Sequence, residues 1–190
     1  MVNRQAGERV IDALQDGAAK FKRALKDRQG DAATGIRRQV ERIRSRDSEL
    51  NNRVPTTRRR RRGESRAEYG EAQTRARMDD LGYSRISDPN HHPNANGIDD
   101  IFIHRDTGHV MIVESKYGRS RLGRLVDGTR QMSREWLTRP FNNHTSRIHH
   151  ALPPGSVLSG DQVRAGLRRE LVTPAVARIR AGDIQISTRF

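Results

Sequence analysis

Three charged residues near the middle of the chain have the types and the order that phosphodiester chemistry needs. Asp99 comes first, and Glu114 and Lys116 follow at the end of a long apolar run. Two carboxylates supply the hard oxygen ligands that Mg²⁺ prefers, and this ion keeps water molecules that can serve as nucleophile. An ammonium group beside them can orient or deprotonate that water, or stabilise charge that develops in the transition state. The residues therefore predict metal-dependent hydrolysis of a phosphodiester.

Lys116 stands out because this chain otherwise uses arginine for positive charge. Of its 37 Lys and Arg residues, only Lys20, Lys22, Lys26 and Lys116 are lysine. Lysine is a compact point charge whose pKa can shift, whereas arginine is a planar and permanently charged fork. An amine kept in an arginine-only neighbourhood indicates a specific chemical role.

The elements that must position these residues form a β-hairpin. Residues 98–104 and 109–117 are rich in β-branched residues and are joined by a short turn that ends in glycine. Glu114 and Lys116 have the same parity and share one face of the strand, and antiparallel pairing brings Asp99 opposite them. The alternative to a catalytic site is that Glu114 and Lys116 form an exposed ion pair on the strand and that Asp99 lies in a turn.

The rest of the chain predicts helices around a small sheet. Helical patterns cover residues 8–28, 36–50, 65–81, 131–137 and 161–171, and residues 183–187 alternate like a last strand. Residues 84–96 and 118–129 are expected to be loops, and residues 140–158 give no clear pattern. This order predicts an α/β fold (or α+β) with a small mixed β-sheet flanked by helices.

Three parts are expected along the chain: an N-terminal helical segment (1–50), a basic linker (51–63) and a compact domain (64–190). The linker contains five adjacent arginines, Arg58–Arg62. Adjacent like charges repel and stay solvated, which favours a flexible hinge over an arm that contacts phosphates. The N-terminal helices are expected to be a remnant of a delivery region or a partner-binding segment.

Composition limits the partners and the chemistry. The formal net charge is +14 and the sequence pI is about 11.4, so polyanions are attracted. The absence of cysteine excludes disulfides and thiolate zinc sites. No apolar run approaches the roughly 20 residues that cross a bilayer, so stable membrane insertion is not expected. A basic nucleic-acid-binding module without catalysis remains an alternative.

Three sequence segments together resemble the PD-(D/E)xK (restriction-endonuclease-like) nucleases. More narrowly, they look like the C-terminal toxin domains of bacterial polymorphic toxins and of contact- or type VI-delivered effectors. The resemblance covers roughly residues 64–140 and rests on Gly97-Ile98-Asp99, on Val113-Glu114-Ser115-Lys116-Tyr117-Gly118, and on Gln131-Met132-Ser133 with Trp136.

The resemblance implies a restriction-endonuclease-like core and assigns roles to its residues. Asp99 and Glu114 would bind Mg²⁺ (or Mn²⁺), and Lys116 would assist catalysis. Glu71, on the preceding helix, matches a further acid that can join the metal site, although it could equally form a surface ion pair with a neighbouring arginine. Gln131 matches a glutamine that contacts the substrate or the metal shell.

Two departures from the family pattern concern the first acid. Ile98 stands where the family name has proline, and the adjacent Asp100 leaves open which aspartate faces the metal. Parity favours Asp99.

The resemblance and the charge together predict partners and a place of action. DNA is the expected substrate, with RNA as the alternative, and Arg119, Arg121 and Arg124 are expected to meet its phosphates because they follow the catalytic strand. Such a toxin would be secreted or contact-delivered and would act in the cytoplasm of a competitor bacterium. Its producer would need an acidic cognate immunity protein. The histidine pairs at residues 91–92 and 149–150 lack the helical spacing of a zinc site and are expected in loops.

Overall fold

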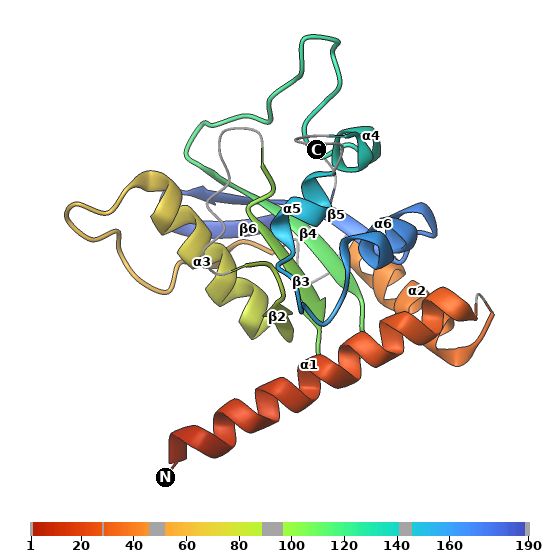
Figure 1. Cartoon of the computed structure of the whole chain (residues 1–190). Coiled ribbons are helices and arrows are strands. Elements are labelled where there is room, and N and C mark those ends of the chain that lie inside the picture. Colours follow the sequence, from red (N-terminus) through yellow and green to blue (C-terminus); the bar gives the residue numbers. More distant parts are fainter. Residues whose placement is uncertain (1, 28, 46–51, 89–96, 141–145, 189–190) are drawn as a thin grey trace.

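A mixed sheet forms the centre of the computed structural model, which describes residues 2–27, 29–45, 52–88, 97–140 and 146–188 (Figure 1). Within these residues the sheet has six strands in the order β1-β6-β5-β4-β3-β2. The pair β4–β5 is parallel and the other neighbours are antiparallel. The strands are β1 (Val54–Pro55), β2 (Tyr83–Arg85), β3 (Asp100–His104), β4 (Val110–Tyr117), β5 (Val172–Arg180) and β6 (Asp183–Ser187). The expected mixed α/β architecture is confirmed.

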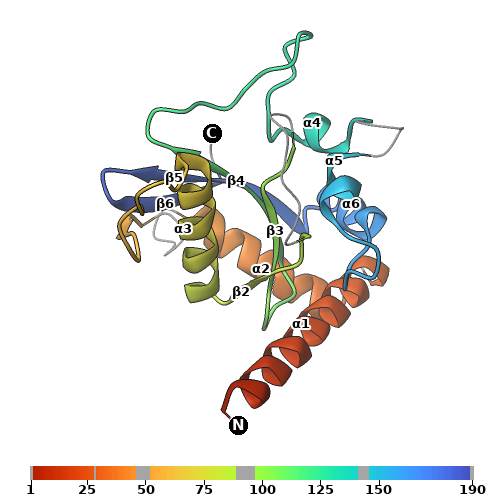
Figure 2. The same ribbon diagram turned by 60° about the vertical axis from the view of Figure 1, so that its left-hand side comes forward.

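Helices cover both faces of this sheet. They are α1 (Val2–Lys26), α2 (Asp31–Arg44), α3 (Arg66–Asp80), α4 (Arg134–Thr138), α5 (Arg147–Ala151) and α6 (Gly160–Arg168). Figure 2 shows α3 on one side of the strands and α6 with the C-terminal half of α1 on the other. No helix in the described part of the chain has the length and apolar character needed to span a bilayer.

The β3–β4 hairpin has the expected register. Asp100 pairs with Val113 and Ile103 with Val110. The turn requires glycine at position 108, where φ is +75° and a Cβ would lie 2.5 Å from the carbonyl oxygen of Gly17 in α1. The turn end of the hairpin is therefore pressed against α1, and the opposite end is left for the acidic residues.

Helix α3 begins at a capping box. The Ser65 hydroxyl accepts from the Glu68 amide, and the Glu68 carboxylate accepts from the Ser65 amide. Its buried residues Tyr69 and Met78 pack with Phe102 and Val113 of the hairpin. The helix thus lies along β4, and its first turns reach the end of that strand where Glu114 and Lys116 lie.

The opposite face of the hairpin packs against the N-terminal helices. Phe21 of α1 and Ile36 of α2 are fully buried in one cluster with Ile101 and Ile112. Phe21 also fits closely over Gly166 of α6, where a Cβ would lie 2.4 Å from its ring. Residues expected to form a separate N-terminal segment therefore share the core of the sheet, while the division of the chain into domains stays a prediction.

The segment expected as a flexible linker contains strand β1, which pairs with β6. It is also tied to α3, because the Tyr69 hydroxyl donates to the carbonyl oxygen of Arg58 (2.7 Å) and the Thr57 amide donates to the Gln73 side chain (2.7 Å). The sequence favours a hinge here, whereas hydrogen bonds to two buried α3 residues hold the segment in place.

Several element boundaries also differ from expectation. Strand β2 occupies the start of the expected loop 84–96, residues 89–96 of which lie outside the described residues. The helix expected at 131–137 begins only after Ser133, whose hydroxyl caps it by accepting from the Trp136 amide. The helix expected at 36–50 ends at Arg44, and residues 46–50 are outside the described part.

Strand β5 is not predicted by the sequence pattern although it lies at the middle of the sheet. Pro174 occurs inside it, opposite Ile112 of β4. Proline cannot donate to a strand ladder and argues against a central strand, which is why the segment gives no clear strand pattern. In the structure β5 pairs with the whole length of β4, from Val110↔Val172 to Tyr117↔Ile179.

Candidate active site

Asp99 lies immediately before β3 and points toward β4. The backbone amide of Ser115 donates to Asp99 Oδ2 over 2.6 Å. Extending the hairpin register by one pair places Asp99 opposite Glu114. Antiparallel pairing therefore brings the first acid to the second, as the sequence predicts.

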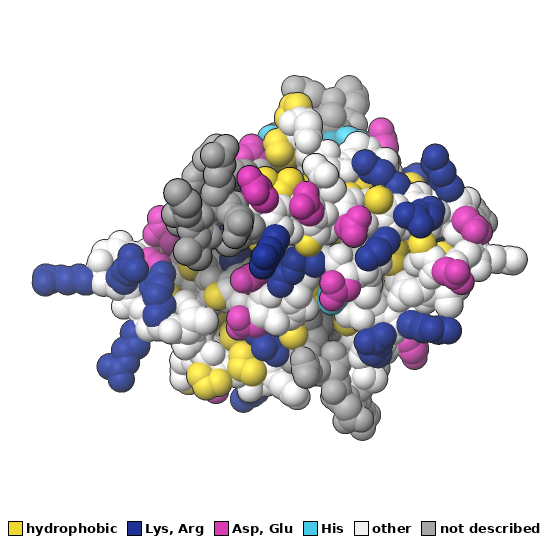
Figure 3. All heavy atoms as spheres, turned by 90° about the horizontal axis from the view of Figure 1, so that it is seen from below, with side chains coloured by type: hydrophobic (Ala, Val, Ile, Leu, Met, Phe, Trp, Pro, Cys, Tyr) yellow, Lys and Arg dark blue, Asp and Glu magenta, His cyan; other side chains and the backbone are white. Residues whose placement is uncertain are grey.

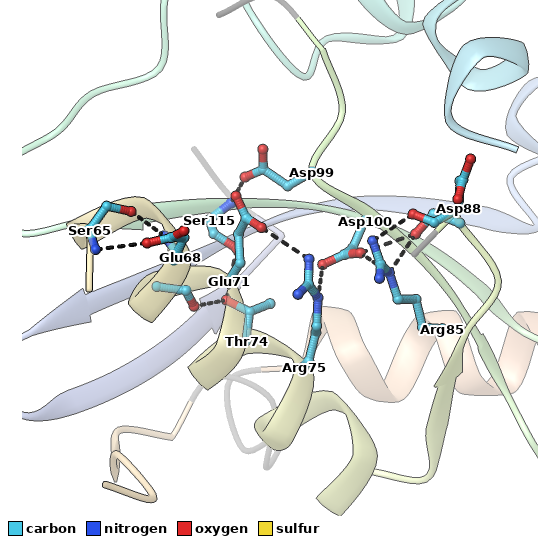
Figure 4. A network of polar contacts seen from close by, with 12 residues as sticks. Ser65, Glu68, Glu71, Thr74, Arg75, Arg85, Asp88, Asp99, Asp100 and Ser115 are labelled. Carbon is cyan, nitrogen blue, oxygen red and sulfur yellow. Dashed lines mark hydrogen bonds and ion pairs between the residues drawn. The ribbon is translucent and has the colours of Figure 1, made fainter. Parts of the chain in front are cut away.

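Asp100 points away from this cluster (Figure 4). Its side chain is fully buried, accepts from Arg75 Nε (3.0 Å) and the Ser87 hydroxyl (3.1 Å), and forms an ion pair with Arg85. These partners come from α3, from β2 and from the segment just after β2, so Asp100 joins the helix to the edge of the sheet. Of the two neighbouring aspartates, Asp99 is the one that lies beside Glu114.

Glu114 is the most buried member of the cluster, with 4% of the residue exposed. Its Oε1 accepts from Lys116 Nζ (2.7 Å) and from Gln131 Nε2 (2.8 Å). Its Oε2 is buried and has no hydrogen-bond partner among the residues that the structure describes. A buried carboxylate oxygen without a partner is costly, so this atom indicates a place where a cation or a donor can bind.

Burial shifts the titration of these acids. It raises the pKa of Asp99 to about 8, helped by repulsion from the Glu114 carboxylate and opposed by the Ser115 amide. Burial also raises the pKa of Glu114, although the Lys116 ammonium opposes this shift. Negative charge is therefore disfavoured in this cluster until a further positive charge enters it.

Gln131 connects the strand to the loop that follows it. Its amide donates to Glu114, and its carbonyl oxygen accepts from the Gly123 backbone amide (2.9 Å). One side chain thus fixes the 118–130 loop above the carboxylate. The adjacent Met132 adopts a φ of 68°, which turns the chain into α4.

Glu71 stands on α3 near the same carboxylates. It accepts from Arg75 Nη2 at 3.0 Å, so the ion pair considered from the sequence is formed. Burial is the largest influence on Glu71 and raises its pKa. Its charge also raises the pKa values of Asp99 and Glu114. Arg75 bridges Glu71 to Asp100, and no hydrogen bond joins Glu71 directly to Asp99 or Glu114 among the described residues.

Two of the three arginines expected to meet phosphates lie together. Arg119 and Arg121 line a surface hollow of about 430 Å³ with Tyr117 of β4 and Arg180 of β5. Arg124 lies apart from this hollow, where its Nη1 donates to the Gly128 carbonyl oxygen within the tip of the loop. The structure therefore brings Arg119 and Arg121, but not Arg124, next to the end of β4.

The sequence does not predict a role for Arg178 and Arg180, which the structure brings to this end of the sheet. Arg178 pairs with Lys116 across the parallel β4–β5 ladder, so both side chains project from the same face. Arg180 Nε donates to the Gly118 carbonyl oxygen (3.0 Å). The alternation of Ala177 and Ile179, which are buried, with these two arginines is a usable strand signal that Pro174 obscures.

A magnesium ion would suit the donor set better than a metal that needs a full side-chain cage. Among the described residues, no group of three or more His, Cys, Asp or Glu side chains could by itself hold a metal ion. Mg²⁺ usually binds through one or two carboxylates and keeps several waters. Asp99, the unpartnered Oε2 of Glu114 and a backbone carbonyl of β4 match that requirement.

The histidine pair at residues 149–150 lies in helix α5, not in the loop that the sequence predicts. His149 forms hydrogen bonds with the Ser146 hydroxyl (2.9 Å) and with Asp161 (3.2 Å), on the α5–α6 side of the molecule. The pair at residues 91–92 lies outside the described residues.

Comparison with protein-family models, with curated proteins and with solved structures finds no match for this chain. Its function is therefore inferred from its own residues and from the motifs that resemble the PD-(D/E)xK nucleases.

Proposed function

We propose that this protein is a Mg²⁺-dependent nuclease that hydrolyses phosphodiester bonds of DNA. The observation that carries the proposal is the state of Glu114. One oxygen of this buried carboxylate is held by Lys116 and Gln131, and the other is buried beside Asp99 with no hydrogen-bond partner in the described part of the chain. This arrangement leaves one carboxylate oxygen available to a cation that Asp99 can share.

Each side chain has a distinct role in this proposal. Asp99 and Glu114 would hold the ion, whose charge polarises the phosphate and lowers the pKa of a bound water. Lys116, which is paired with Glu114, would orient the attacking water or stabilise charge on the phosphate oxygens. Gln131 positions Glu114, and Glu71 adds negative charge that favours cation binding at this end of β4.

The biological setting is proposed from the sequence motifs and the net charge. A domain resembling polymorphic-toxin nucleases would cut DNA in a competitor's cytoplasm after delivery by a specialised secretion system. A protein with a net charge of +14 is suited to an acidic immunity protein that covers the proposed site. Both are parts of the same proposal.

The test is cleavage of supercoiled plasmid with Mg²⁺, with EDTA, and with the variant Lys116→Ala. We expect nicking in Mg²⁺, none in EDTA, and a loss of about 10²–10⁴-fold in the variant, which is the usual contribution of a positioned acid or base. Lys22→Ala is the matched control, because Lys22 is an exposed lysine on α1.

Two results would contradict the proposal. Equal nicking by the wild type and Lys116→Ala would show that the assignment of the catalytic site is wrong. If the protein cuts neither plasmid nor a structured RNA, the enzyme proposal is wrong, and a basic nucleic-acid-binding module remains. Cleavage of RNA alone would keep the site and change the substrate.

A further inference from the structure

A row of polar and basic side chains crosses the sheet from Lys116 to its far edge. Lys116 of β4 pairs with Arg178 of β5, and Arg178 pairs with Gln185 of β6. Val54 of β1 pairs with Ile184, so the next position of that antiparallel pair sets Arg53 opposite Gln185. Residues paired across neighbouring strands project from the same face, and the four residues therefore form one line.

A second observation concerns three of these four residues. Arg53, Arg178 and Gln185 line one surface hollow together with Arg180. Arg180 also lines the larger hollow beside Arg119 and Arg121. Arg180 therefore lines both hollows, and the larger one is also lined by Tyr117 of the strand that carries Lys116.

The face on which the row lies is opposite α3. Ala177 and Ile179 are buried in the cluster that contains Tyr69 and Met78 of α3. The intervening residues of β5 must project the other way. Arg178 is partly exposed and Arg53 is exposed, so both guanidinium groups are open to a ligand.

Lys116 is paired with Glu114, whereas the two arginines of the row have no carboxylate partner among the described residues. The smaller hollow contains one acid, Asp183, which pairs with Arg180 in the β5–β6 ladder. No ion pair with a carboxylate is formed by Arg53 or Arg178 within the described ranges. Arginines without a carboxylate partner are suited to the oxygens of a phosphate.

We propose that Arg178 and Arg53 form a phosphate-binding track that holds the nucleic-acid strand beyond the bond that is cut. This inference rests on the proposed nuclease function and adds the path of the substrate. Neighbouring strands lie about 4.8 Å apart, so Arg53 is about 14 Å from Lys116 along the row. With a rise of about 3.4 Å per nucleotide in one strand, the track covers about four nucleotides.

The line of the row favours a nucleic acid over an acidic protein. The phosphates of a nucleic-acid strand repeat at regular intervals, and the row begins at the residue placed beside the reacting phosphate. Binding of an acidic protein would not require the basic residues to lie in a line that starts at Lys116. The proposal therefore commits to the sugar–phosphate backbone as the occupant, with contacts that position the strand without reading its sequence.

The experiment compares two double variants that remove the same charge. Arg53→Gln/Arg178→Gln removes the track, and Arg23→Gln/Arg168→Gln removes two exposed arginines of α1 and α6. Binding of a labelled DNA oligonucleotide is measured in EDTA, where no turnover occurs, by fluorescence anisotropy at several salt concentrations. Thermal unfolding of each variant verifies that the fold is kept.

We expect the track variant to lower the slope of log K against log salt by about 1.5, because each lost phosphate contact contributes about 0.7–0.9. The control variant should keep a slope close to that of the wild type. Equal slopes for the track variant and the wild type, or an equal loss in the control, would overturn the proposal. Either result would also be expected if the row bound an acidic protein instead of a nucleic acid.

Cleavage in Mg²⁺, measured separately, distinguishes the two proposals. A wild type that cuts DNA while the track variant keeps the full slope contradicts only the track. A wild type that binds with the expected difference in slopes but never cuts contradicts only the nuclease. Absence of binding altogether would overturn both.

Discussion

Asp99 and Asp100 are adjacent in sequence, and the structure gives them different environments. Asp99 lies beside Glu114 and accepts one backbone hydrogen bond, whereas Asp100 is enclosed by Arg75 and Arg85. The same residue type therefore serves two purposes one position apart, because successive residues at a strand point to opposite faces.

Replacement of each aspartate by asparagine should separate these purposes. Asp99→Asn should lower cleavage by at least about 10²-fold with little loss of stability, since the amide can still accept from Ser115. Asp100→Asn should cost about 3 kcal/mol of unfolding free energy, because it removes a fully buried carboxylate and leaves the largely buried Arg85 without its acidic partner. Nicking rates and urea unfolding of the two variants measure this. Similar behaviour of both variants would contradict the assignment.

The raised pKa of Asp99 predicts how stability depends on pH without metal. In the folded protein this acid keeps its proton up to about pH 8, whereas an unfolded aspartate loses it near pH 3.9. Between these values the folded state binds more protons, so the free energy of unfolding falls as pH rises. A tenfold difference in proton affinity between the folded and unfolded states corresponds to about 1.4 kcal/mol.

The measurement is the melting temperature in EDTA from pH 5 to pH 9. We expect the wild type to lose stability with rising pH relative to Asp99→Asn, and Mg²⁺ to restore stability most strongly at the alkaline end, where the carboxylate is ionised. Parallel profiles for the two proteins would mean that Asp99 titrates normally.

At the scale of elements, the hairpin was predictable and its neighbours were less so. The apolar run of β4, the glycine in the turn and the parity of Glu114 and Lys116 all act within a few residues, so the sequence reveals them directly. The position of Asp99 followed from the same register. The local sequence pattern was sufficient to predict an element wherever contacts between residues close in sequence determine its structure.

Long-range pairing decided the elements that the sequence did not reveal. Pro174 hides a central strand that is held by its pairing with β4, and strand β1 exists because β6 offers it an edge. Arg178 became a candidate only when that pairing placed it beside Lys116. The acids and the lysine were therefore recognisable from sequence alone, but the arginines that complete this face were not.

The packing of α1 makes a further prediction. Phe21 is fully buried against the sheet and α6, whereas Val10 on the same helix is about half exposed. Phe21→Ala should lower the unfolding free energy by about 3–5 kcal/mol. Val10→Ala should change it by less than about 0.5 kcal/mol. Chemical denaturation of the intact chain provides the values. Equal and negligible effects would show that the N-terminal helices fold independently of the sheet.

At the scale of the whole molecule, positive charge is unevenly distributed. Figure 3 shows Asp and Glu mixed with Lys and Arg over the middle of the face seen from below, while basic side chains project alone at the left-hand rim. Figure 1 places the 57–64 loop at that rim. In this loop Arg58 is paired with Glu64, and Arg59, Arg61 and Arg62 are exposed.

This charge predicts competition by polyanions. Heparin should inhibit DNA cleavage at low salt, because it occupies the same basic surface through its sulfates. The concentration for half-inhibition should rise steeply with salt, as it does when counterion release drives binding. A neutral dextran of similar size is the control. Inhibition that is independent of salt would indicate that the surface charge does not bind the substrate.

The parallel pairing of β4 with β5 has a consequence for the order in which the molecule is assembled. Val110 pairs with Val172, which is synthesised much later. The strand that carries Glu114 and Lys116 therefore leaves the ribosome well before the strand that it pairs with. Until β5 docks, β4 has an open edge and lacks the residue that flanks Lys116. A nascent chain that ends before β5 would lack the strand that pairs with β4, and its unpaired edge would expose it to aggregation and proteolysis.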